Sequence, residues 1–290
     1  MVTGGKWDAA VSTGNAGEIR AAMPYYPVKK YGFNFLLQPQ LTPYLGPLLF
    51  YPPDLKKNTS LYSFQNRHLN ALIQKLPHNT VYQQFSFTPA VDNWYPFYLN
   101  GYRQSTRYTF ILKNIKNHEE VFAGFSNTVK RQIGKAQKSI TVTGEDDICS
   151  VFGLLTNSNQ KEKLKLGLGR SKLKALDHEL KKRGQRKILI ARDRQNQLVA
   201  GLYLVWDKRQ AYLLALGSDY GKEQYHAPKL LIWEAIKTAS AYVDVFDFEG
   251  SMIPGVERLY RNFGGVKTPY FEVKKYKNRF IKAAFSLLNK

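Results

Sequence analysis

Cysteine is nearly absent from this 290-residue sequence, which contains Cys149 alone. One thiol cannot form an intramolecular disulfide, so a disulfide-stabilised scaffold is excluded and a reducing cytoplasm is favoured. Histidine is also scarce, and the five histidines and Cys149 show none of the spacings typical of zinc ligands. No Ser-His-Asp or nucleophilic-cysteine signature is present. The sequence therefore predicts neither a metal site nor a covalent nucleophile.

Long apolar runs are absent as well. The longest candidate, Leu41–Tyr51, is interrupted by Pro43, Gly46 and Pro47, whereas a membrane-spanning helix needs about 18 apolar residues. The first ten residues lack the apolar segment of a signal peptide. We expect a cytoplasmic protein without a transmembrane segment, with the inner face of the membrane as an alternative location.

Acidic residues are few. The chain has 22 Asp and Glu against 43 Lys and Arg, a formal net charge of +21. This balance favours an anionic partner, such as tRNA, anionic lipid headgroups or a phosphorylated small molecule. The basic residues are densest over residues 161–187 and 274–290. The apolar fraction of 43% supports a packed core, and the length is sufficient for two domains.

The most informative stretch is residues 243–265. An apolar, aromatic and β-branched run over 243–248 predicts a buried strand, and Gly250-Ser251 ends it. A short basic helix is predicted over 256–262. Carboxylates at the end of a buried strand, next to a helix start and arginines, suit recognition of an anionic ligand. A plain strand-to-helix connection with solvated charges is equally compatible with the pattern.

Two carboxylates of this stretch, Asp247 and Glu249, are the candidate general bases. Strand alternation predicts that both lie on one face. The alternative for each is a structural carboxylate paired with Arg258 or Arg261. We favour the structural role for Asp247 and the role of base for Glu249.

Hydrophobic periodicity along the chain predicts alternating groups of strands and helices. Strands are expected at residues 6–13, 18–23, 33–37, 82–87, 108–115, 187–192, 198–206, 211–217, 243–248 and 270–274. Helices are expected at residues 60–76, 119–137, 146–158, 171–183, 229–242, 256–262 and 278–288. Ser171 is a candidate N-cap, Pro228 suits the first helical position, and residues 24–32 and 41–53 are predicted loops.

The two halves of the chain repeat one order of elements. Each has a hairpin meander, an irregular loop, an apolar helix, an apolar strand, a break and a further strand. This order predicts an α/β (α+β) protein of two GNAT-like lobes, with mixed, mainly antiparallel sheets flanked by helices.

Several motifs resemble those of the Fem-type (FemABX-like) branch of the GNAT superfamily, the tandem-GNAT peptidoglycan aminoacyltransferases and their relatives. They are Ala22-Met23-Pro24-Tyr25-Tyr26, Leu41-Thr42-Pro43-Tyr44-Leu45-Gly46-Pro47, the basic helix Val129–Ala136, Phe246-Asp247-Phe248-Glu249-Gly250-Ser251 and Phe263-Gly264-Gly265. The resemblance implies a first lobe over residues 1–118, a second over 119–273, a groove between them, and a basic C-terminal helix over 274–290 that packs on the first lobe. It also implies acylation of an acceptor amine by an aminoacyl-tRNA.

The chain departs from the family pattern in three places. Relatives carry a helix before the position where Met1 stands, so either that helix is missing or the true start lies upstream. The helical arm that some members insert in the second lobe is reduced to residues 171–183. The Phe-Lys pair of the family's peptidyltransferases reads Leu259-Tyr260 here, which argues against tRNA-dependent aminoacyl transfer.

The donor site is less clearly marked. Residues 221–228 lack the glycine spacing with which GNAT enzymes bind coenzyme A, although the helix start that follows is a potential anion site. His226 there is a candidate ligand or base, with capping as the alternative. Residues 167–172 do not match a P-loop. The candidate substrate-binding residues are Lys130, Arg131, Lys135, Arg170, His226, Ser251, Arg258, Tyr260 and Arg261.

The combined prediction is an N-acyl- or aminoacyltransferase that acts on an amine of a phosphorylated cell-envelope precursor. The acceptor is an anionic small molecule or lipid-linked compound. The donor is aminoacyl-tRNA or acyl-CoA, and no covalently bound cofactor is expected. The alternatives are an acyl-CoA-dependent GNAT in polysaccharide or lipid modification, and a non-catalytic anion-binding protein that contacts nucleic acid or anionic membrane.

Overall fold

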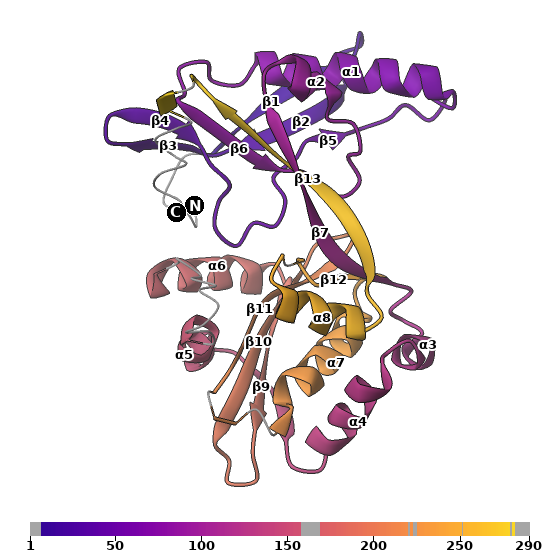
Figure 1. The fold of residues 1–290 in the computed structure, drawn as a ribbon, viewed down its shortest axis with the longest axis vertical. Coiled ribbons are helices and arrows are strands. Elements are labelled where there is room, and N and C mark those ends of the chain that lie inside the picture. The colour runs from indigo at the N-terminus through magenta and orange to yellow at the C-terminus, as the bar shows by residue number, and fades with distance from the viewer. Residues whose placement is uncertain are drawn as a thin grey trace. The chain divides into compact units, whose positions relative to one another are not determined.

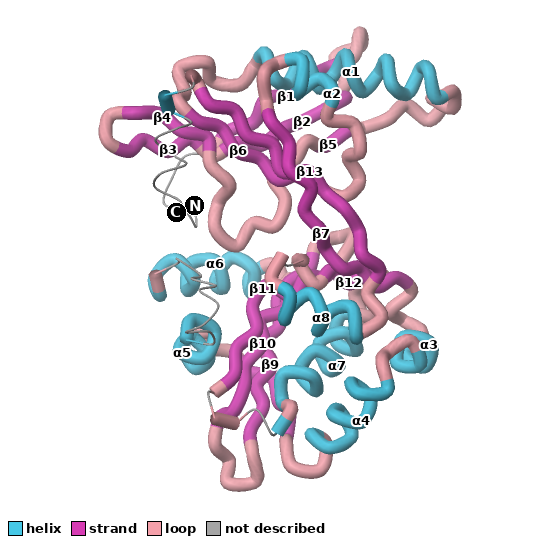
Figure 2. The backbone as a smooth tube through the Cα atoms, viewed as in Figure 1, coloured by secondary structure: helices cyan, strands magenta, loops and turns pink. Residues whose placement is uncertain are grey.

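Figures 1 and 2 show a computed structural model that describes residues 7–157, 169–219, 221–222, 225–250, 252–278 and 280–281. These described residues form two compact units. The first holds the chain up to Arg107 and from Pro269 onwards, and the second holds Tyr108–Thr268. The chain thus passes between the units within two long strands, β7 (Arg103–Lys113) and β13 (Val266–Tyr276). The lobe boundaries expected from the sequence were 118/119 and 273/274.

The first unit is built on two groups of strands. One has the order β1-β2-β5, with β1 at Asp8–Thr13, β2 at Ile19–Tyr25 and β5 at Leu48–Leu49. The other has the order β3-β4-β6-β13, with β3 at Pro27–Lys30, β4 at Phe33–Leu36 and β6 at Tyr82–Ser86. Its helices are α1 (Asn58–Gln74) and α2 (Tyr95–Leu99), and Figure 1 shows α1 lying across β1 and β2.

The core of the first unit follows from the two periodicities of its sequence. Alternation in β2 buries Ala21 and Met23, while the helical spacing in α1 buries Leu69 and Leu72. Side chains that repeat every second residue in a strand and every third or fourth residue in a helix share one face. These two faces meet in one cluster together with Phe85 of β6.

The second unit has a mixed sheet in the order β7-β12-β11-β10-β9-β8. The strands are β8 (Thr141–Glu145), β9 (Arg186–Arg192), β10 (Leu198–Trp206), β11 (Ala211–Ser218) and β12 (Val245–Asp247). The meander β9-β10-β11 is antiparallel, as the sequence predicted. β12 pairs in parallel with β11 and antiparallel with β7, so the predicted carboxylate strand lies between these two strands.

Helices flank this sheet on its two sides in Figures 1 and 2. α5 (Cys149–Asn157) and α6 (Arg170–Lys182) lie on one side. α4 (Asn127–Ala136), α7 (Ala227–Ala239) and α8 (Pro254–Asn262) lie on the other, and α3 (His118–Ala123) precedes α4. The α6 helix is fixed by an ion pair between Asp177 and Arg186 Nε of β9, at 3.1 Å, which is almost wholly buried.

Several expectations about the elements were wrong. The single helix predicted over residues 119–137 is two helices, because the Ser126 hydroxyl accepts a hydrogen bond from the Val129 amide and starts α4 as a new helix. Ser171 lies inside α6, whose N-cap is Gly169. The predicted loop at 24–32 contains β3, and the sequence reading missed α2 and β8. The C-terminal helix predicted over 278–288 falls mostly outside the described residues.

Within the described part of the chain, every helix is too short or too polar to cross a bilayer.

Two glycines let α5 approach the sheet of the second unit closely. A Cβ at Gly217 of β11 would lie 2.1 Å from the backbone oxygen of Leu154 in α5, and one at Gly201 of β10 would lie 2.8 Å from Val151 Cγ1. Real Cβ contacts are not that short, so any larger residue must push α5 away from the sheet.

We expect Gly217→Ala to lower the free energy of unfolding by about 1–3 kcal/mol, because the added methyl group overpacks the contact with α5. The matched control is Gly134→Ala in α4, where an added Cβ meets nothing within 4 Å. That variant should gain up to about 1 kcal/mol from the higher helix propensity of alanine. Denaturant unfolding of the two variants measures both effects, and equal stability of the two would contradict the packing argument.

Candidate functional site

The turn that follows β12 has an unusual backbone. Glu249 has φ +61° and Gly250 has φ +55°, so two successive residues adopt the left-handed conformation. For glutamate this conformation is uncommon and strained, and such strain is frequent at functional sites. A Cβ at Gly250 would lie 2.1 Å from the backbone oxygen of Tyr108, so the turn packs directly on β7 and position 250 requires glycine.

Asp247, at the end of β12, is fully buried. Its carboxylate accepts hydrogen bonds from the Thr109 hydroxyl of β7, from the Glu249 amide at 2.8 Å and from the Gln210 side chain at 3.4 Å. These donors come from three segments of the second unit. Asp247 is therefore held by polar partners, as a structural carboxylate would be, but its partners differ from the predicted arginines. Arg261 pairs with Glu257 at 3.5 Å, and Arg258 is exposed.

The carboxyl group of Glu249 lies beside Asp247. Its Oε1 atom is buried and has no hydrogen-bond partner among the described residues. Burial, followed by the negative charge of Asp247, raises the pKa of Glu249 well above 4.5. β12 ends at Asp247 and the next turn is left-handed, so strand alternation does not govern the direction of Glu249. A buried carboxyl oxygen without a hydrogen bond lowers the free energy of unfolding. Such a group is frequent at functional sites, so Glu249 is a functional candidate.

Tyr260 of α8 completes this group. Its ring stacks on Phe248 with centroids 4.9 Å apart and planes at 27°. Burial, then the charges of Glu249 and Asp247, raise the pKa of the Tyr260 hydroxyl above its usual range. The phenol therefore stays protonated and can donate a hydrogen bond.

A second polar cluster lies where α4 packs on the start of α7. His226 is the N-cap residue of α7, with φ +54°, and among the described residues its side chain makes no capping hydrogen bond. Burial, then the charges of Lys229, Lys135 and Arg131, lower the pKa of His226. The structure therefore brings together three predicted residues from two separate helices.

Lys229 was missed in the sequence reading. It is three residues after His226, on the same side of α7, and burial lowers its pKa. Its position in the first turn of a helix next to a histidine was the available signal. Together Arg131, Lys135, His226 and Lys229 form a basic cluster at the positive end of the α7 dipole, an arrangement that attracts phosphate groups.

The remaining predicted binding residues lie elsewhere. Lys130 Nζ donates a hydrogen bond to the backbone oxygen of Ala123 at 2.6 Å. Arg170 lies over the Phe152 ring at 5.9 Å. Arg258 and Arg261 are exposed on α8, and Ser251 lies outside the described residues. Among the residues that the structure describes, no group of three His, Cys, Asp or Glu side chains could hold a metal ion.

The raised pKa of Glu249 has a consequence for stability. Because its folded pKa lies above the ordinary value of 4.5, the charged form is favoured in the unfolded chain. The contribution of neutral Glu249 to the free energy of unfolding is therefore fully present below pH 4.5, and it is lost as the pH rises through the folded pKa of Glu249. We expect Glu249→Gln, which cannot ionise, to melt at a higher temperature than the parent at pH 8 and at nearly the same temperature at pH 4.

Thermal unfolding at these two pH values measures the difference. The control is Glu179→Gln on α6, a side chain that is about half exposed and forms a weak i,i+4 ion pair with Arg183. It should change the melting temperature little at either pH. A lower melting temperature of Glu249→Gln at pH 8 would contradict a buried, unpaired carboxyl group.

Residues 123–258 match the family described as Acetyltransferase (GNAT) domain. No curated protein matches the sequence. The fold is similar to that of FemX, with a TM-score of 0.67 and 12% sequence identity over 100% of this chain and 92% of that chain.

Two further solved structures are similar. One is the C-terminal domain of a putative lysylphosphatidylglycerol synthetase from Agrobacterium fabrum, with a TM-score of 0.55 and 12% identity over 97% of this chain and 87% of that chain. The other is a tandem GNAT protein from the clavulanic acid biosynthesis pathway, with a TM-score of 0.54 and 10% identity over 94% of this chain and 83% of that chain. The match over residues 123–258 and the similarity to these structures confirm the predicted fold, a tandem-GNAT fold like that of FemX.

Proposed function

We propose that this protein is an N-acyl- or aminoacyltransferase that acts on an amine of a phosphorylated cell-envelope precursor. The observation that carries the proposal is the half-buried Glu249 side chain, whose buried Oε1 atom has no partner among the described residues and which lies on a strained turn within residues 123–258. A carboxyl group with a raised pKa is suited to take a proton near neutral pH. Burial, followed by the charge of neighbouring Asp247, keeps the pKa of Glu249 high, and Asp247 also accepts a hydrogen bond from the Glu249 amide in the turn.

The proposed reaction is direct transfer. The amine nitrogen attacks the acyl carbonyl carbon, a C–N bond forms, and the bond from the carbonyl carbon to the donor's leaving oxygen or sulfur breaks. Glu249 accepts the proton that the amine loses, the Tyr260 hydroxyl donates a hydrogen bond to the leaving atom, and the proton then passes from Glu249 to the leaving oxygen or sulfur. No covalent enzyme intermediate is needed, in agreement with the absence of a nucleophile signature from the sequence.

The basic cluster of Arg131, Lys135, His226 and Lys229 is the proposed binding site for the donor's phosphates. Its cations and the uncapped start of α7 attract polyanions such as acyl-CoA or aminoacyl-tRNA. The sequence lacks the standard glycine spacing for coenzyme A, and Tyr260 replaces the lysine of the peptidyltransferases, so both donors remain alternatives.

The acceptor is proposed from chemistry and fold together. The net charge of +21 favours an anionic acceptor, either a soluble phosphorylated precursor or a lipid-linked one. Two similar structures, FemX and a putative lysylphosphatidylglycerol synthetase, support an acceptor in the cell envelope. We therefore propose that the protein acts in the cytoplasm at the inner face of the membrane.

We expect Glu249→Gln to lower the turnover rate by about 10²–10⁴-fold while substrate affinity changes little, because the amide cannot accept the amine's proton. Turnover and binding are measured separately, by release of the leaving group and by isothermal calorimetry. Glu179→Gln on α6 serves as the control. Retained turnover in Glu249→Gln would exclude Glu249 as the base, whereas a parent protein that binds ligands without turnover would favour a non-catalytic anion-binding function.

The first experiment compares thermal shifts with acetyl-CoA, a long-chain acyl-CoA, a UDP-linked muropeptide and tRNA at two salt concentrations. A muropeptide shift that survives high salt supports the cell-envelope acceptor. A shift with acyl-CoA alone supports the coenzyme A donor. A shift with tRNA alone that disappears at high salt indicates non-specific polyanion binding and contradicts the proposal.

The donor site is tested with the double variant Arg131→Gln, Lys135→Gln. Both side chains are exposed, so the fold should be retained. We expect the dissociation constant of the donor to rise by about tenfold or more, because two cations are removed. The control variant Lys138→Gln removes an exposed charge just beyond α4, and an equal loss in the control would indicate a generic charge effect.

A further inference from the structure

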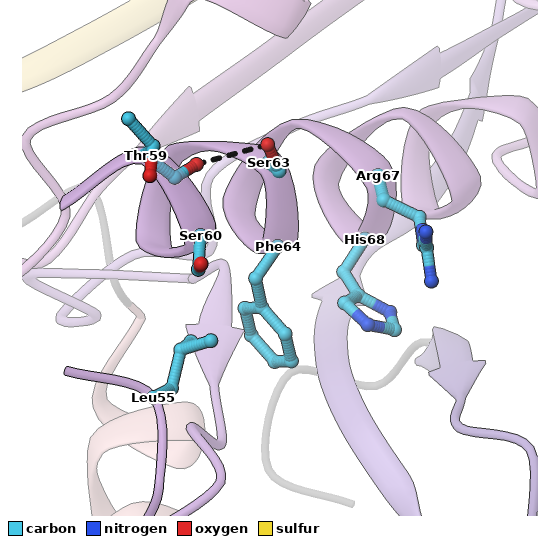
Figure 3. A pocket seen from close by; sticks show the side chains of 7 residues that line it. All are labelled: Leu55, Thr59, Ser60, Ser63, Phe64, Arg67 and His68. Carbon is cyan, nitrogen blue, oxygen red and sulfur yellow. Dashed lines mark hydrogen bonds between the residues drawn. The ribbon is translucent and has the colours of Figure 1, made fainter. Parts of the chain in front are cut away.

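A pocket of about 350 Å³ lies in the first unit, along α1 (Figure 3). It is lined by Leu55, Thr59, Ser60, Ser63, Phe64, Arg67 and His68. Ser60, Phe64 and His68 follow each other at intervals of four residues, so they share one face of the helix. Figure 3 shows these three side chains pointing from α1 toward the same side, where Leu55 lies.

His68 is the buried polar group of this pocket. It is 6% exposed, and one of its ring nitrogens, Nδ1, is hydrogen-bonded to the Ser12 hydroxyl of β1 at 2.8 Å. This bond and the packing against the Phe64 ring, at 4.3 Å between centroids, fix the orientation of the imidazole. The other ring nitrogen, Nε2, has no partner among the described residues and is left to form one hydrogen bond with a ligand.

Positive charge accompanies His68. Arg67 is exposed, forms no ion pair with another described residue, and lies close enough to His68 for its charge to contribute to the lowered pKa of that histidine. At the other end of the pocket α1 begins after Lys57, and within the described chain no side chain caps its first amides. Both ends of the pocket are therefore favourable for negatively charged groups.

The middle of the pocket is apolar. The half-buried ring of Phe64 contacts Tyr51, with centroids 5.4 Å apart, and forms a wall with Leu55. From Ser60 to His68 the helix rises about 12 Å. That length and the order of polar, apolar and polar groups suit an elongated ligand with an anionic end and a flat or apolar body.

We propose that this pocket binds an organic phosphate, whose phosphate group contacts Arg67 and His68 and whose ring lies against Phe64 and Leu55. The hydroxyl groups of Thr59 and Ser60 bind polar groups at the far end. The inference does not depend on the proposed function, because none of these residues takes part in the transfer reaction described above.

The experiment is a titration of the full-length protein, labelled with ¹⁵N in its histidine side chains, with phenyl phosphate. The chain has five histidines, so each site reports separately. The His68 signal is assigned from its loss in His68→Gln or, if that variant does not fold, from its shift in Ser12→Ala. We expect the His68 signal to move on titration with phenyl phosphate, less with inorganic phosphate and not with phenol.

The matched variants are Arg67→Gln and Arg131→Gln, each of which removes one exposed arginine. Arg67→Gln should weaken phenyl phosphate binding at His68 by about tenfold and leave the His226 response unchanged. Arg131→Gln should weaken the response of His226 and leave phenyl phosphate binding at His68 unchanged. A response of His226 alone, or equal shifts of all five histidines, would overturn the proposal, because it would show binding at the donor site or non-specific binding by the basic surface.

Discussion

The hydrogen bonds to the buried Asp247 carboxylate hold the candidate catalytic centre together. Its donors come from β7, from the segment before β11 and from the turn after β12, so one side chain joins three parts of the second unit. A buried carboxylate is tolerated only when such donors satisfy it. Burial raises the pKa of the neighbouring Glu249, and the negative charge of Asp247 raises it further, so Glu249 is favoured in its neutral form.

The left-handed turn after β12 sets the direction of the Glu249 side chain. Because Glu249 has φ +61°, its side chain leaves the direction of the strand and its carboxyl lies near Tyr260. Gly250 permits the turn to lie against the backbone of β7, where a side chain would collide with Tyr108. The strain at Glu249 and its unsatisfied oxygen both cost stability, a pattern that is common where structure serves chemistry.

The charges of the protein are distributed unevenly with respect to this centre. Glu249, whose pKa is raised by burial and by Asp247, interacts with Tyr260, which stacks on Phe248, whereas cations lie near His226 at the start of α7 in the same unit. An acyl transfer between an amine and a phosphate-bearing donor needs both environments, since the base must take a proton and the donor must be bound by its charge. In the first unit, His68 is buried on α1 together with the core residues Leu69 and Leu72, and it also lines the pocket.

Local pattern determined much of the architecture. Alternation and helical spacing predicted the meander β9-β10-β11, the helix α1 and the β12-turn-α8 segment, because each depends on residues close in sequence. Composition determined the basic character. Local pattern failed at Ser126, where a side-chain cap divides one apolar periodicity into two helices, and at β3, a short exposed strand that exists through its pairing with β4.

The tertiary structure alone decided the chemistry of the site. The Asp247–Thr109 bond spans 138 residues, and the cluster around His226 joins α4 to α7, so neither was visible in sequence spacing. The sequence offered arginines as partners for Asp247, and the fold supplied a hydroxyl, an amide side chain and a backbone N–H. Residue types decide which charges a chain carries, but pKa values depend on burial and on neighbours that only folding brings within a few ångströms.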